Sequence, residues 1–195
     1  MTSSHMRIAV CAALFCIACA THRTAAQTER KAADRYLVSA KAGVVNLIEG
    51  RAEVRGTGAW RAATTKDMMR SGDAARTGAG ARLEVLLTPG SFLRLGANAE
   101  VEMTDASLER LVLRLHRGSL IVEAVDAGDD APIVTITTPQ TTIAIVRGGV
   151  YRIEADAAAS EVVVHKGRAL VGNSSLLVKG KRKTVVAANG TAKAA

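Results

Sequence analysis

The sequence predicts an all-β protein, built from many short antiparallel strands in a sandwich, jelly-roll-like or coiled β architecture. Apolar and polar residues alternate with a period of two along most of the chain after Gly43, which is the pattern of half-buried strands. Short glycine-marked gaps separate these stretches, and no stretch shows a sustained helical period. Many short strands at this spacing are typical of sandwiches and barrels.

The chain begins with a segment that has the features of an export signal. Residues 6–20 hold one arginine and then an apolar run that is too short to span a bilayer comfortably, as in a signal peptide. The segment CIAC at 16–19 is similar to a bacterial lipobox, in which Cys19 would be lipidated and become the mature N-terminus. Conventional cleavage before Thr21 or before Gln27 satisfies the small-residue rule equally well. We expect an exported protein, in the periplasm or at the outer membrane. If Cys19 is lipidated, the lipid anchor is its contact with the membrane; if the leader is cleaved conventionally, no membrane contact is expected.

The predicted organisation is a signal peptide over 1–20, a tether over 21–42, a β domain over 43–187 and a tail over 188–195. All three cysteines lie in the leader, so the domain has no disulfide. Aromatic residues make up 3% of the chain. The core must therefore be built from Leu, Val, Ile and Ala, each large side chain contributing roughly 1.5–3 kcal/mol on burial.

The strands are placed by their alternation. Expected strands before the central segment cover 44–54, 82–87, 92–95, 100–103, 108–115, 119–124 and 133–137, and those after it cover 160–165, 168–171, 174–179 and 183–187. The buried faces are expected to carry Leu83, Val85, Leu87, Leu111, Leu113, Leu115, Val162 and Val164. A hairpin is expected at Pro89-Gly90, between two of these strands.

The central segment, TTPQTTIAIVRGGVYRIE at 137–154, is interpreted as two strands joined across Gly148-Gly149. Alternation precedes the glycine pair and resumes after it with Tyr151 and Ile153. Glycine supplies the backbone freedom that a tight connection needs. Pro139 stands just before the first strand, where its missing N–H removes no ladder bond.

This segment resembles the core motif of the FecR domain family: Thr-Pro, an apolar strand, Arg-Gly-Thr, a spacer, an aromatic residue and a further strand. Gly149 stands where the family normally has Thr. The similarity extends in order through nearly all of 50–186, with Pro89 where the family usually has Asp. The positions that carry the motif, expected to be structural, are Trp60, Gly78, Gly90, Gly118, Pro139, Gly148, Tyr151 and Gly167, with Trp60 and Tyr151 expected in the core.

The resemblance implies an extracytoplasmic domain that binds or signals and is not an enzyme. We expect a non-enzymatic module that interacts with an envelope protein or an anionic polysaccharide. The alternative is a periplasmic regulatory subunit that relays envelope status to a membrane anti-sigma or receptor partner. The family's transmembrane helix and cytoplasmic anti-sigma segment are not recognised in this sequence, which favours the binding module over the relay subunit. The oligomeric state is left open.

The residues that could carry chemistry are few. His116 and His165 have no second ligand at metal spacing, and solvated histidines are the favoured interpretation. Asp126, Asp129 and Asp130 lack the spacing and distal glutamate of an EF-hand, so a solvated turn is expected. No cofactor, metal or catalytic residue is predicted.

Charge is the remaining indication of partners. Residues 27–195 keep 24 of the 26 Lys and Arg against all 18 Asp and Glu, a net charge of +6. Such a surface attracts anionic polymers or lipid headgroups, whereas export and the absence of a basic face interleaved with stacking aromatics argue against nucleic acid. The candidate interaction residues are Arg110, Arg114, Arg117, Lys179, Lys181, Arg182 and Lys183. For the last four, a solvated exposed hairpin is the favoured interpretation, because a four-residue cluster is common.

Overall fold

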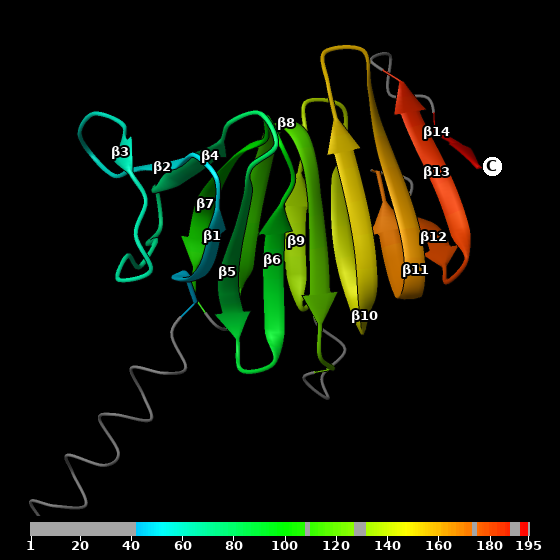
Figure 1. The fold of residues 1–195 in the computed structure, drawn as a ribbon. Helices are drawn as coiled ribbons and strands as arrows, with labels where there is room; N and C mark the ends of the chain where they lie inside the picture. The colour runs from blue at the N-terminus through cyan, green and yellow to red at the C-terminus, as the bar shows by residue number, and fades with distance from the viewer. Residues whose placement is uncertain (1–41, 108–109, 127–131, 173–174, 188–191, 195) are drawn as a thin grey trace, which may run out of the picture. The chain divides into compact units, whose positions relative to one another are not determined.

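The computed structural model describes residues 42–107, 110–126, 132–172, 175–187 and 192–194. Its strands belong to one mostly antiparallel sheet that does not close on itself, which confirms the predicted all-β class (Figure 1). The strands are β1 (Val44–Glu49), β2 (Ala52–Arg55), β3 (Arg61–Ala62), β4 (Ala74–Thr77), β5 (Arg82–Thr88), β6 (Ser91–Leu95), β7 (Glu100–Ala106), β8 (Leu111–Ala124), β9 (Val134–Thr137), β10 (Thr142–Ala155), β11 (Ala159–Val171), β12 (Leu176–Lys179), β13 (Arg182–Ala187) and β14 (Ala192–Ala194).

The central segment differs from its prediction. A single strand, β10, runs through Gly148-Gly149 where two strands were expected. Register shifts between Ile145 and Tyr151 interrupt the pairing of β10 with β11, so the strand bulges and bends at the glycines and does not reverse. The same correction applies to β8, which runs through Gly118, and to β11, which runs through Gly167.

Each long strand changes partners at its bend. The first half of β8 pairs with β7 and β9, and its second half pairs with β6 and β10. The pairing divides the sheet into two layers that share the long strands. Layer A holds β1, β5, β6, β13 and β14 with the second halves of β8 and β10 and the first half of β11. Layer B holds β2, β3, β4, β7, β9 and β12 with the other three halves. Figure 1 shows β5, β6 and β13 in front of β7, β9 and β12.

The core fills the space between the layers with the inward side chains of both. Every residue expected on the buried faces is buried. At the bend of β8 the buried positions change from odd to even residue numbers, and at the bend of β11 they change from even to odd. In β8 the buried residues are Leu111, Leu113 and Leu115 before Gly118, then Leu120, Val122 and Ala124 after it. One extra residue at the bend therefore keeps the apolar side chains facing inward in the second layer.

Several boundaries differ from expectation. The expected strand over 44–54 is split into β1 and β2. The hairpin expected at Pro89-Gly90 is confirmed, because β5 and β6 pair antiparallel on either side of it. The sheet extends past the expected domain end at Ala187, because β14 pairs with β13. The predicted leader, Cys19 and nearly all of the tether lie outside the described residues. Across the residues that the structure does describe, no helix is long and apolar enough to span a membrane.

Candidate functional site: a basic corner

A buried tyrosine fastens the place where β10 and β11 bend between the layers. The Tyr151 hydroxyl donates to the main-chain oxygen of Arg147 and accepts a hydrogen bond of 2.8 Å from the N–H of Arg168. The side chain lies in the core, as expected, and burial raises the pKa of its hydroxyl. The neutral phenol therefore ties both bent strands at neutral pH.

Two glycines allow the main chains to come this close. A Cβ atom at Gly149 would lie 2.0 Å from the carbonyl oxygen of Lys166, and one at Gly167 would lie 1.9 Å from the Tyr151 hydroxyl oxygen. A threonine at position 149, as in the motif described above, would not fit unless β11 moved away. This departure from the motif is therefore matched by close packing of β10 on β11.

Removing the Tyr151 hydroxyl should loosen this corner. The Tyr151→Phe variant is expected to lose about 1–3 kcal/mol of unfolding free energy, because the Arg168 N–H is left without its partner in a buried setting. Urea denaturation of the wild type and the variant measures this directly. Equal midpoints would show that the hydroxyl does not stabilise the bend.

Six cations gather at this bend, and we call them the basic corner: Arg147, Lys166, Arg168, Lys179, Lys181 and Arg182. All six are exposed. The turn between β12 and β13 is held against the bend of β11, since Gly180 N–H donates to the Gly167 oxygen and Lys181 N–H to the Val164 oxygen. Residues far apart in sequence are thus placed side by side by main-chain hydrogen bonds.

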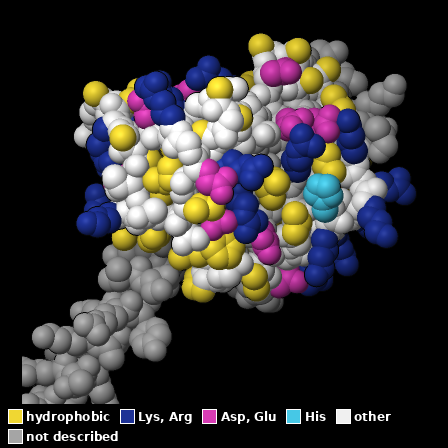
Figure 2. Space-filling model, viewed as in Figure 1, with side chains coloured by type: hydrophobic (Ala, Val, Ile, Leu, Met, Phe, Trp, Pro, Cys, Tyr) yellow, Lys and Arg dark blue, Asp and Glu magenta, His cyan; other side chains and the backbone are white. Residues whose placement is uncertain are grey.

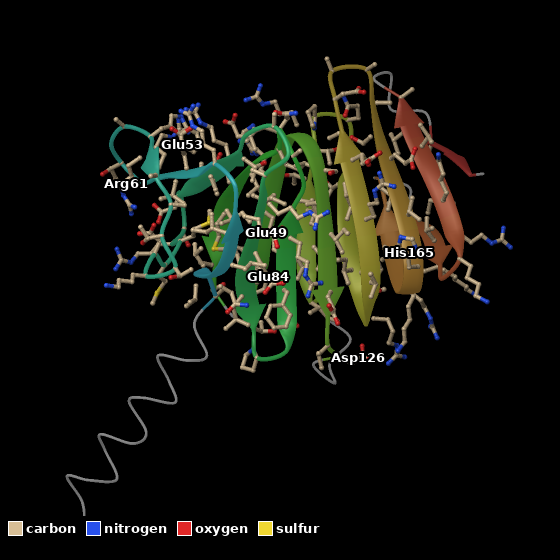
Figure 3. All side chains as sticks on the ribbon, viewed as in Figure 1. Glu49, Glu53, Arg61, Glu84, Asp126 and His165 are labelled. Atoms are coloured by element: carbon tan, nitrogen blue, oxygen red, sulfur yellow. The ribbon has the colours of Figure 1, made fainter. Side chains whose placement is uncertain are left out.

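The basic corner differs from the rest of the surface in its ion pairing. Among the described residues, Arg147 is the one member with a carboxylate partner, Asp126 at 3.9 Å. Figure 3 shows Asp126 just past the end of β8, next to the bend of β10, where the Gly148 N–H donates to its carboxylate. Elsewhere most cations are paired with acids: Arg51, Arg61, Arg76, Arg82, Arg94, Arg110, Arg117, Arg152 and Lys183. The corner therefore concentrates positive charge that its own acids do not neutralise.

Three corner cations stand directly opposite one another on adjacent strands. Arg147 of β10 faces Arg168 of β11, which faces Lys179 of β12. Neighbouring strands lie about 4.8 Å apart, and like charges in directly opposed positions are destabilising. A bound anion would relieve this repulsion.

The repulsion predicts that a loss of charge stabilises the free protein. Lys179→Glu is expected to raise the unfolding free energy by about 0.5–1 kcal/mol, because a like-charged pair with Arg168 becomes an opposite-charged one. Urea denaturation at low salt should show the gain, and in about 1 M salt the gain should shrink. A destabilised variant, or a gain that salt leaves unchanged, would contradict this account of the corner.

The structure divides the candidate interaction residues into two groups. Lys179, Lys181 and Arg182 belong to the basic corner. Arg110 and Arg117 are each 3.2 Å from a carboxylate, Asp105 and Glu100 respectively. Lys183 lies 2.7 Å from Glu161, and Arg114 is exposed on the first half of β8, in layer B.

Sequence reasoning missed Arg147, Lys166 and Arg168. The signal that could have found them is their position beside bend glycines, in Arg147-Gly148 and Lys166-Gly167-Arg168, as in Lys179-Gly180-Lys181. A cation next to a glycine at which a strand bends lies at the edge where the two layers meet.

Trp60 is not the core residue that was expected. It is half-buried, and the guanidinium groups of Arg55 and Arg76 lie over its ring, 4.7 and 4.3 Å from the ring centre. Arg76 also binds Glu53 at 2.8 Å, and hydrogen bonds from Arg76 and Arg51 lower the pKa of Glu53. The indole thus belongs to a cation–π surface cluster on β2 and β4.

The remaining motif positions have local structural roles. Gly118 stands at the bend of β8, where a Cβ would lie 2.5 Å from the Cα of Ala99. Gly78 N–H donates to the Arg51 oxygen, Gly90 lies in the β5–β6 turn, and Pro139 lies in the turn before β10.

The histidines offer no metal site within the described part of the chain. His116 Nε2 lies 3.2 Å from Glu102, and His165 is exposed on β11 (Figure 3). No group of three or more potential metal ligands occurs among the described residues. Asp129 and Asp130 lie outside them.

Comparison with known proteins identifies the family. The model of the family described as FecR protein matches residues 73–170, just over half of the 195 residues. The chain belongs to the FecR family.

The fold is also found in solved structures. Two crystal structures of a "putative anti-sigma factor" from Parabacteroides distasonis ATCC 8503, at 2.50 and 1.65 Å resolution, match with a TM-score of 0.53 and with 19% and 18% identity. The match covers 63% of this chain and 58% of each of those chains, so it spans less than two thirds of their length. A search of curated proteins found no match.

Proposed function

We propose that this protein is a non-enzymatic regulatory module of the bacterial envelope, which binds a negatively charged envelope component at its basic corner. Membership of the FecR family supports a regulatory role. The single observation that carries the binding proposal is the gathering of six exposed cations at one bend of the sheet.

The corner is suited to anions for electrostatic reasons. Several like charges within a few strand spacings create a local field that attracts a multiply charged partner and speeds its encounter. The cations stand on paired strands or on a turn held by main-chain hydrogen bonds. A site on rigid elements needs little ordering when it binds, which reduces the entropic cost of association.

The second candidate is a subunit that relays envelope status to a membrane anti-sigma or receptor protein. The observation that favours it is the fold shared with the Parabacteroides distasonis structures. In this case the anionic partner would itself be the regulatory protein. The two candidates differ in the identity of the component that the corner holds.

Both candidates require the domain to act outside the cytoplasm. Export through the leader and anchoring at a lipidated Cys19 would place it in the periplasm or at the outer membrane, where anionic polymers and receptor domains are available. The intact mass of the mature protein distinguishes a lipidated Cys19 from cleavage before Thr21 or Gln27.

Cross-linking of the tagged full-length protein in its native bacterium, followed by mass spectrometry, tests the proposal. The expected result is repeated recovery of one envelope component, either an anionic polymer or a regulatory protein. Recovery of a membrane regulator selects the relay function. Recovery of no envelope component would overturn the proposal.

A further inference from the structure

The outer face of layer B carries an uncharged row that crosses five strand segments. Cross-strand neighbours run from β8 to β12 through Val112, Thr135, Ala144, Leu170 and Leu177. The first four are half-buried, and Leu177 at the end of the row is 45% exposed. We call this set, in which Thr135 is the one polar member, the apolar row.

The outer face of layer A is different. There the central row places Ile121 and Val163 among charged residues, Arg94, Arg152 and Lys183. Arg94 binds Glu84 at 2.6 Å and Glu123 at 2.8 Å. Figure 2 shows this face, with Lys and Arg side chains in contact with Asp and Glu over its centre. An uninterrupted uncharged row therefore distinguishes layer B.

The apolar row ends at an open edge of the sheet. Within the described part of the chain, β12 pairs with β11 on one side and with no strand on the other. An edge strand presents main-chain donors and acceptors that an additional strand can use. By contrast, the edge strand β1 is covered, since Val45 N–H donates to the Asp67 oxygen and Met69 N–H to the Gly43 oxygen.

A row of cations lies beside the apolar row, two residues further along β12. Leu177 and Lys179 both point outward from β12, two residues apart, while Val178 between them is buried. Lys179 continues the row of cations formed with Arg168 and Arg147. The outer face of layer B thus presents an apolar row and, displaced along the strands and two residues away on β12, a row of cations.

We propose that this face docks an extended segment of a protein partner, which adds a strand to β12 and places an apolar side chain beside Leu177 and an acidic one beside Lys179. Because residues on one face of a strand are two apart, the segment carries an acidic residue two positions from an apolar residue. The inference rests on the proposed function and specifies its partner as a protein.

A polysaccharide would use only part of this surface. It could neutralise the cationic row, but it has no peptide ladder for the edge of β12. A second copy of the chain fits poorly, because β12 carries no acidic residue that two-fold pairing with itself could place beside Lys179. A strand from another protein that carries acidic side chains can pair with the main chain of β12, contact the apolar row and neutralise the cations at the same time.

The test uses a photo-cross-linking amino acid placed at Leu177 of the full-length protein in its native bacterium. The matched control carries it at Leu47, which is 46% exposed on β1. We expect the Leu177 probe to label a partner peptide with the apolar and acidic spacing given above. Lys179→Glu should reduce that labelling at least fivefold, and the Leu47 probe should not label the same peptide.

Several results would overturn the docking proposal: adducts at position 177 with a glycan, with this chain itself, with a peptide that lacks the spacing, or no adduct. The failure is distinguishable from failure of the proposed function. If whole-protein cross-linking recovers an envelope component through the basic corner while position 177 labels no such peptide, only the docking proposal is wrong. If neither experiment recovers a component, both are wrong.

Discussion

Gly167→Ala is expected to destabilise the domain by about 3 kcal/mol or more, the largest effect of any single substitution considered for the bend. The new Cβ would lie 1.9 Å from the Tyr151 hydroxyl oxygen, which forces the tyrosine or β11 to move, and overpacking of this kind costs about 1–3 kcal/mol. Gly167 also has a φ of 100°, where a side chain adds about 1–3 kcal/mol of strain. Urea denaturation gives the change in unfolding free energy.

Gly80→Ala is the matched control for backbone strain. Gly80 has a φ of 67°, and nothing lies within 4 Å of its Cβ position. Its substitution is expected to cost about 1 kcal/mol, the penalty of the left-handed conformation alone. Equal costs at positions 167 and 80 would show that contact with Tyr151 does not hold the bend together.

Reversal of three corner charges should produce the largest functional effect. Lys166→Glu, Lys181→Glu and Arg182→Glu together are expected to weaken binding to immobilised polygalacturonate, a polyanion, at least about tenfold, or about 1.4 kcal/mol. The reason is that the local field of the corner changes sign. The full-length variant should elute from this matrix at lower salt than the wild type.

The control is a triple variant of equal charge change at Lys66, Arg70 and Arg82, each replaced by Glu. These exposed cations lie on β5 or before β4, away from the corner. If net charge alone governs retention, the two triple variants elute together, and the corner has no special role. Earlier elution of the corner variant alone indicates a localised site.

Most strands of the domain could be predicted because alternation reports burial directly, although β3, β4 and β14 were not among the expected strands. Leu83, Val85 and Leu87 are buried as their spacing requires, and the class of fold follows from many such segments. The continuity of β8, β10 and β11 could not be predicted in this way. A glycine that interrupts alternation looks the same whether the chain reverses or bends into a second layer, since the outcome depends on which strands pair with each half.

The surroundings of the aromatic residues and the grouping of the cations could not be predicted from the local sequence either. Tyr151 and Trp60 both stand in family motif positions, yet Tyr151 ties two bends in the core while Trp60 lies under arginines at the surface. The C-terminal cations were recognised by their closeness in sequence. Arg147, Lys166 and Arg168 join them because β11 pairs with β10 and β12 and because Gly180 and Lys181 bond to the main chain of β11. These are long-range contacts that composition does not encode.

The most direct test of the basic corner compares three proteins in the native bacterium: the wild type, the corner triple variant and the control triple variant. Each is cross-linked and the captured envelope component is quantified, after equal amounts of folded protein have been verified. The account predicts that capture by the corner variant falls at least fivefold while the control variant retains the wild-type level. Equal capture by all three proteins would contradict the claim that the basic corner is the binding site.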